Sequence, residues 1–251
     1  LLLIIIVFSI LSPYFATQSN AIGILLATAV NGILAIGVTF VIISGGIDLS
    51  IGTVMTLSAV MTGVFVTNWG LPLPLGILFG ILTGGFMGLL NGILIARFRI
   101  PPFIATLGMM QVARGLALVF ADVKPIYFND TPDFSSAAMG SIVGSLIPGL
   151  DIPNLVLIFF AAAILAAFVL GRTILGRYTF AIGSNEEATR LSGVNVKQWK
   201  ASEYVVNGLF AVFQVGDLPL PRGSNINDLP VPADMVLDQE LVMVTNDAGV
   251  I

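Results

Sequence analysis

The sequence contains no cysteine and no histidine, and only three of its 251 residues are lysine. Without cysteine the chain has no disulfide, thiolate metal site or thiol nucleophile, and without histidine it lacks the usual proton shuttle near neutral pH. No lysine follows a glycine, so the chain has no phosphate-binding P-loop. No carboxylate pair or nucleophile with a base stands at usable spacing either. We therefore expect no enzymatic activity, no ATP hydrolysis by the chain itself, no metal and no cofactor.

Charge is equally scarce, because only 10% of the residues are charged whereas 57% are hydrophobic, and the mean hydropathy is +1.02. Residues 1–47 carry no charged side chain, and after Asp48 the next charge is Arg97. This composition lies outside the range of soluble globular proteins and indicates an integral membrane protein. The ten basic residues form no run and the formal net charge is −4, which argues against nucleic-acid binding.

Long apolar segments predict an all-α, polytopic transmembrane helix bundle. A helix needs about 20 apolar residues to cross the hydrocarbon core. On that criterion the sequence predicts six complete spans and a partial seventh. The complete spans are 1–16, 21–44, 51–67, 74–96, 103–121 and 152–171, and the partial span is 201–213.

The basic residues predict the orientation, because Lys and Arg are enriched in cytoplasmic loops. Seven of the ten follow the fourth or the sixth span, whereas the segment 122–151 holds four Asp and one Lys. We therefore expect residues 171–200 and the N-terminus inside and residues 122–151 outside. Within the outer segment, the uncharged residues 135–150 form either a plain loop or an interfacial, re-entrant piece.

Small and amide side chains inside the spans indicate close helix packing. Asn-Gly pairs at Asn31, Asn91 and Asn207 lie in apolar runs, so we expect their amides to hydrogen-bond between helices rather than to form turns. The fourth span carries a glycine ridge with a period of four residues, which predicts contact with another helix backbone. The ridge consists of Gly76, Gly80, Gly84, Gly88 and Gly92.

Two polar features inside the apolar body are candidates for a translocation path. In the segment 44–52 (SGGIDLSIG), two glycines break one helix before another begins, and Asp48 or Ser50 either caps the second helix or belongs to a discontinuous helix at a substrate path. Arg114 lies near mid-membrane with Gln111 one turn away, so we expect both to face the bundle interior. Their role is either structural pairing or a place near the path.

Residues 171–200 form a long mixed-charge segment on the predicted cytoplasmic side. Within this segment, Glu187-Ala188-Thr189 followed by Gly193 predicts a short helix that ends at the glycine, with Asn185 or Ser184 as its N-cap. The segment is a candidate for docking a partner. Its alternative is an ordinary solvated loop.

The sequence resembles the permease subunits of bacterial ATP-binding-cassette importers of the ribose, xylose and galactose class. The Glu-Ala-Thr-x3-Gly stretch at Glu187 is similar to their Glu-Ala-Ala-x3-Gly coupling motif, with Thr189 in place of the second alanine. The resemblance covers about residues 1–213 and includes further segments in order. These are NGILA at 31–35, GGIDLS at 45–50, NG at 91–92, IPPFIATLG at 100–108, RGL at 114–116 and AIGSN at 181–185.

The resemblance implies a permease domain over residues 1–213 in the lipid of the bacterial inner membrane. It implies three partners: a cytoplasmic ATP-binding subunit, a periplasmic or extracellular sugar-binding protein, and a second permease copy in a homodimer. The residues that it implies for coupling are Asn185, Glu187, Ala188 and Gly193. Those that we expect along the path are Asp48, Gln111 and Arg114.

The resemblance ends near Gln214, and residues 214–251 differ in character from the rest of the chain. They contain one basic and six acidic residues and four prolines, whereas residues 1–213 contain nine basic and eight acidic residues. We expect this tail to be disordered or non-native, and we interpret the start at Leu1 as an N-terminal clip. Two alternative functions stay open. The polar residues Asp48 and Arg114 would suit an ion-coupled secondary carrier, and the altered tail would suit a truncated membrane remnant that does not transport.

Overall fold

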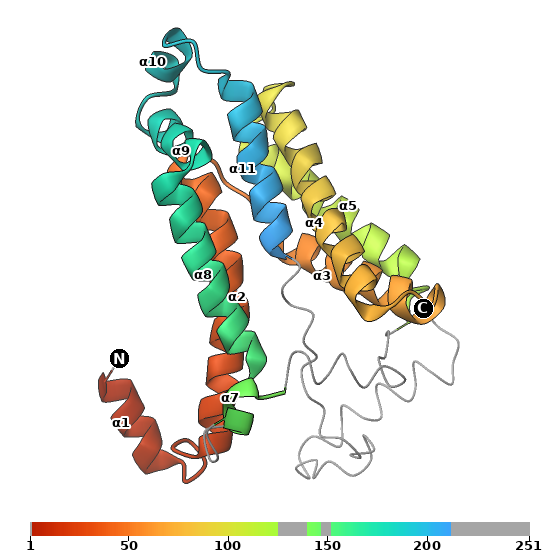
Figure 1. Ribbon diagram of the computed structural model, residues 1–251, viewed down its shortest axis with the longest axis vertical. Helices are drawn as coiled ribbons and strands as arrows, with labels where there is room; N and C mark the ends of the chain where they lie inside the picture. Colours follow the sequence, from red (N-terminus) through yellow and green to blue (C-terminus); the bar gives the residue numbers. More distant parts are fainter. Residues whose placement is uncertain (1, 125–139, 147–151, 212–251) are drawn as a thin grey trace. The chain divides into compact units, whose positions relative to one another are not determined.

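The computed structural model describes residues 2–124, 140–146 and 152–211, and every element in these ranges is a helix (Figure 1). This confirms the predicted all-α fold class. The predicted tail, residues 214–251, lies outside the described residues. The helices are α1 (Leu2–Leu11), α2 (Gln18–Ile43), α3 (Ile51–Gly63), the π-helix η1 (Val64–Asn68), α4 (Leu73–Ala96), α5 (Pro102–Phe120), α7 (Ile142–Leu146), α8 (Asn154–Arg172), α9 (Ile174–Ser184), α10 (Glu186–Leu191) and α11 (Val196–Phe210).

Five helical segments in the described ranges are long and apolar enough to cross a membrane, one fewer than the sequence predicts. The segment predicted at 1–16 is the exception, because α1 has only 10 residues. At 1.5 Å per residue it is about 15 Å long, half of the hydrocarbon thickness. Pro13 explains why α1 ends at Leu11 rather than continuing to residue 16, since proline disfavours helical geometry at the residue before it. The other five predicted spans correspond to α2, α3 with η1, α4, α5 and α8.

Helix α11 joins two groups of helices. It packs against α4, which also contacts α3 and α5, and against α2, which packs along α8 (Figure 1). Phe210 stacks on Phe40 of α2 with ring centroids 6.3 Å apart, whereas Ala211 belongs to the apolar cluster of α3, α4 and α5. The fully buried Tyr204 lies in a third cluster, with Val41 of α2 and residues of α4 and α5.

The glycine ridge of α4 divides between two neighbours. A Cβ atom at Gly80 would overlap the Thr62 hydroxyl of α3, and one at Gly76 would overlap a side chain of η1. The other three glycines allow backbone-to-backbone contact with α11. Gly84 lies against Gly208, Gly88 against Tyr204 and Gly92 against Ala201.

These contacts also fix the relative direction of α4 and α11. Because Gly92 lies against Ala201 while Gly84 lies against Gly208, the two helices are antiparallel. The C-terminal end of α4, where Arg97 is the C-cap, therefore lies at the same end of the bundle as the start of α11. The two basic clusters of the sequence thus share one end of the bundle, as the orientation that we predict requires.

Candidate functional site

The predicted coupling helix is α10, a six-residue helix with a defined cap at each end. The Asn185 side chain accepts a hydrogen bond of 2.9 Å from the Ala188 amide, so Asn185 is the N-cap and Ser184 is the last residue of α9. After α10, Gly193 adopts a φ of 84°, a left-handed conformation that glycine enters without a steric penalty, and its amide donates to the Arg190 carbonyl at 3.1 Å. The chain therefore turns sharply on both sides of this short helix.

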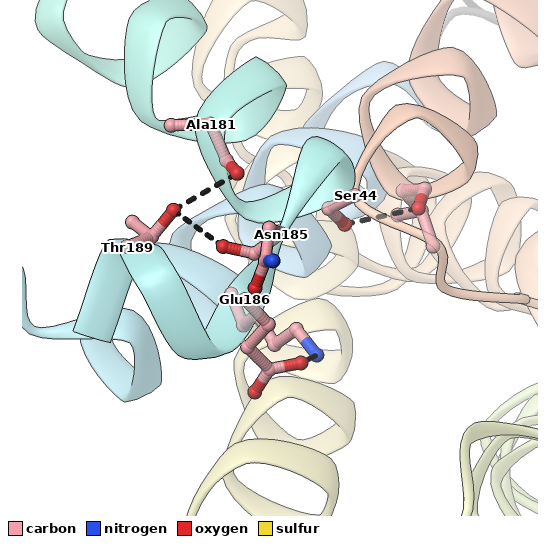
Figure 2. Close-up of polar contacts among 7 residues, drawn as sticks. Ser44, Ala181, Asn185, Glu186 and Thr189 are labelled. Carbon is pink, nitrogen blue, oxygen red and sulfur yellow. Dashed lines mark hydrogen bonds and ion pairs between the residues drawn. The ribbon is translucent and has the colours of Figure 1, made fainter. Parts of the chain in front are cut away.

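Two contacts attach α10 to its neighbours (Figure 2). On one side the buried Thr189 hydroxyl lies 2.9 Å from the Ala181 carbonyl oxygen of α9 and 2.8 Å from that of Asn185. On the other side the Lys200 ammonium group of α11 pairs with the Glu186 carboxylate at 2.6 Å. Contacts to two different helices therefore set the orientation of α10.

The remaining face of α10 is exposed. Glu187 and Arg190 form an ion pair at 2.5 Å with both side chains more than half exposed, and Glu187 raises the pKa of the Arg190 guanidinium. Ala188 is exposed as well, and Leu191 is 77% exposed. A surface ion pair contributes little to stability. The exposed face is therefore available for contact with another protein.

A second polar site forms where the segment 44–52 crosses between α2 and α3. The Asp48 carboxylate accepts hydrogen bonds from the Ser50 amide at 2.8 Å, from the Ser50 hydroxyl at 2.6 Å and from the Asn207 amide group of α11 at 2.8 Å. Burial raises the pKa of Asp48, and these hydrogen bonds partly offset the effect. Ser50 occupies the N-cap position of α3 without a side-chain cap bond, and its hydroxyl donates to Asp48.

The network continues into α4. The Asn91 amide group donates to the Ser50 hydroxyl oxygen at 2.8 Å, and the Tyr204 hydroxyl donates to the Ile47 carbonyl at 3.2 Å. The expectation of amide hydrogen bonds between helices is thus met in part by Asn91 and Asn207, whose amides leave their own helices and bond to the α2–α3 junction. It is wrong for Asn31, which is exposed and donates to a carbonyl of its own helix.

Gln111 and Arg114 lie on the outer surface of the described helices, so the prediction that they face the bundle interior is wrong. Small residues such as Ala113 and Ala117 occupy the buried face of α5 instead. No hydrogen bond or ion pair joins Arg114 to another residue in the described ranges, and no described contact joins it to Asp48. The three predicted path residues therefore do not form one cluster.

The sequence patterns did not single out Glu203, whose side chain is fully buried in α11. The Ser44 and Thr179 hydroxyls lie near its carboxylate but donate to backbone carbonyls, so neither oxygen accepts a hydrogen bond of good geometry among the described residues. The sequence did contain a signal for this residue, because Glu203 is the single charged residue in the predicted span 201–213. The Glu186–Lys200 pair was also missed, since its residues are 14 positions apart and no local pattern links them. In the described ranges no group of three acidic side chains is placed to bind a metal ion.

The comparison with known proteins decides the family. The family described as branched-chain amino acid transport system, permease component, matches residues 20–214. The chain belongs to this family. This membership and the five membrane-length apolar helices of the described ranges make it a multi-pass protein of the bacterial inner membrane. No solved structure matches the chain.

Relatives of the chain include permeases named for sugar transport. The ribose import permease of Haemophilus influenzae is 36% identical over 84% of this chain and 64% of its own length. That of Bacillus subtilis is 39% identical over 84% of this chain and 63% of its own length. The galactofuranose transporter permease of Escherichia coli is 36% identical over 91% of this chain and 67% of its own length. The chain thus spans less than two thirds of the length of the ribose permeases.

Proposed function

We propose that this chain is the permease subunit of an ATP-binding-cassette importer that moves a monosaccharide across the inner membrane. The observation that carries the proposal is the family match over residues 20–214, together with relatives named as import permeases for ribose and fructose and as an ABC transporter permease for L-arabinose. Because the chain has no P-loop, ATP is hydrolysed in a separate cytoplasmic subunit. A periplasmic sugar-binding protein and a second permease copy complete the importer.

The docking surface for the ATP-binding subunit is the exposed face of α10, within the cytoplasmic segment 171–200. Glu187 and Ala188 lie on this face, and Asn185 and Gly193 form its two ends. The face combines an ion pair with the exposed Leu191, a mixture of charged and apolar groups that suits a protein partner. The basic clusters at this end of the bundle support its cytoplasmic location.

The translocation path runs along the outer face of α5, where Gln111 and Arg114 lie. An arginine at mid-membrane costs at least about 2.5 kcal/mol against lipid, so this face turns toward water or protein in the assembled importer. Guanidinium and amide groups donate hydrogen bonds, which sugar hydroxyl groups accept. Asp48 has a different role, because its carboxylate is already bonded to Ser50 and Asn207 at the α2–α3 junction.

Uptake by an Escherichia coli strain from which only the ribose import permease has been removed tests the proposal. Expression of this chain restores accumulation of radiolabelled ribose in an ATP-dependent manner. Accumulation that instead follows a proton or sodium gradient, without ATP, supports the ion-coupled carrier and refutes the proposal. Binding to the ATP-binding subunit without uptake supports the non-transporting remnant.

Orientation is tested separately by labelling. Because the chain contains no cysteine, Ser184→Cys introduces a single reactive thiol at an exposed position. In spheroplasts a membrane-impermeant maleimide leaves this site unlabelled until the membrane is opened. Labelling from outside the intact membrane contradicts the cytoplasmic location of residues 171–200, and with it the docking role of α10.

A further inference from the structure

Helix α10 is joined to the helices on both sides of it by contacts that its sequence motif does not require. The Thr189 hydroxyl reaches back eight residues to the Ala181 carbonyl of α9, and Glu186 pairs with Lys200, 14 residues ahead in α11. Figure 2 shows Thr189 beside Ala181 and Asn185. An alanine at position 189 would occupy the same place without this hydrogen bond. The two contacts therefore attach one short helix to two longer ones.

Both contacts are more protected from water than the ion pair within α10. Thr189 is only 7% exposed, and in the Lys200–Glu186 pair the Lys200 side chain is 22% exposed and the Glu186 side chain 54% exposed. The Glu187–Arg190 pair within α10 is 60% to 64% exposed. Charge and hydrogen-bond interactions weaken as exposure to water increases. Thr189 and Lys200 therefore contribute more to the position of α10 than the ion pair on its surface.

A helix of six residues has too few internal hydrogen bonds to be rigid alone. Its rigidity must come from its attachments. Helix α11 is in turn in backbone contact with α4 through Gly88 and is hydrogen-bonded through Asn207 to the α2–α3 junction. A displacement of α10 that reaches α11 therefore reaches two further parts of the bundle.

We propose that Lys200 and Thr189 are positioning residues that hold α10 between α11 and α9 and transmit its displacement into the bundle. The inference rests on the proposed function only for the source of the displacement, the ATP-binding subunit. Neither residue belongs to the exposed docking face. Loss of either contact therefore leaves docking intact and weakens the mechanical link.

The link itself is tested by hydrogen exchange on the full chain in lipid nanodiscs, without any partner. Lys200→Met and Thr189→Val each accelerate exchange of the α10 amides about two- to fivefold, whereas exchange in α4 is unchanged. The matched control is Lys197→Met, since Lys197 is exposed on α11 and has no ion pair among the described residues. The conservative Lys200→Arg and the reversed pair Glu186→Lys with Lys200→Glu restore the slow exchange.

The transmission is tested in the ribose-permease deletion strain by measuring sugar uptake and ATP hydrolysis together. Lys200→Met lowers the uptake per ATP hydrolysed at least threefold while the amount of bound ATP-binding subunit stays within twofold of wild type. Unchanged α10 exchange in Lys200→Met, or no rescue by the reversed pair, overturns the positioning role whatever the uptake. An unchanged ratio of uptake to hydrolysis despite faster exchange overturns the transmission. Faster exchange in the variants when even the wild-type chain takes up no sugar supports the positioning role and contradicts the proposed function.

Discussion

Gly88→Ala is expected to destabilise the bundle by separating α4 from α11. A Cβ atom at this position would overlap the Tyr204 carbonyl oxygen and would lie 2.9 Å from the Tyr204 carbonyl carbon and 3.1 Å from the Val205 Cα. Non-bonded carbon atoms prefer about 3.5–4.0 Å, so the helices must separate by roughly 0.5–1 Å. Backbone atoms cannot move aside as a flexible side chain does.

The expected cost follows from the length of that contact. A separation at Gly88 also loosens the adjacent contacts of Gly84 and Gly92 with α11, and a gap of 0.5–1 Å removes about a quarter to a half of each dispersion well. Overpacking of this kind typically costs about 1–3 kcal/mol. We expect the free energy of unfolding to fall by that amount.

The assay is unfolding by sodium dodecyl sulfate in lipid–detergent bicelles, followed by circular dichroism. Gly115→Ala is the matched control, because a Cβ atom there meets nothing within 4 Å and alanine favours a helix by about 0.5–1 kcal/mol. Gly115→Ala should therefore be neutral or stabilising. If the two variants unfold within about 0.5 kcal/mol of each other, the ridge does not hold α4 and α11 in close backbone contact.

Three further substitutions test other parts of the bundle. Asn207→Ala leaves the half-buried Asp48 carboxylate short of one donor and should cost about 1–3 kcal/mol in the same unfolding assay, whereas Asn31→Ala, at an exposed site, should cost less than about 0.5 kcal/mol. Arg114→Leu should make translocon insertion of an isolated α5 segment more favourable by about 3–4 kcal/mol, as measured by glycosylation mapping. An unchanged insertion free energy would mean that residue 114 does not lie at mid-span. Gly193→Val should accelerate hydrogen exchange of the α10 amides more than Gly193→Asn, because the left-handed conformation penalises a β-branched residue most. Equal exchange rates in the two variants would contradict that explanation.

Hydropathy was sufficient to predict the helices but not all of their lengths. Five of the predicted spans coincide with described apolar helices, because each is a long apolar segment with at most one charged residue and no proline in its middle. The prediction for residues 1–16 failed because the apolar run continues past Pro13 although the helix does not. Composition measures the affinity of a segment for lipid, whereas helix length also depends on backbone hydrogen bonds.

The arrangement around the sites could be predicted only where it is local. Asn185 and Gly193 enclose a short helix by rules that operate within a few residues, so they were recognisable. Asp48 and Asn207 are 159 residues apart, and only the packing of α11 on α4 and α2 brings them together. The prediction for Arg114 failed for another reason. A polar residue in a span is expected to avoid lipid, but its polarity does not tell which neighbour shields it.

The four-residue period of the glycines on α4 has a further consequence for the register of α11. The ridge repeats about every 6 Å, so α11 could pack on it at nearly equivalent positions one turn apart. Van der Waals contact alone would therefore permit α11 to slide along α4. Hydrogen bonds connect Asn207 to Asp48, Asp48 to Ser50 and Ser50 to Asn91. This chain of bonds can form at only one of these packing positions. Apolar contact thus supplies the adhesion between the two helices, and a few polar atoms at the α2–α3 junction select the one alignment in which the chain folds.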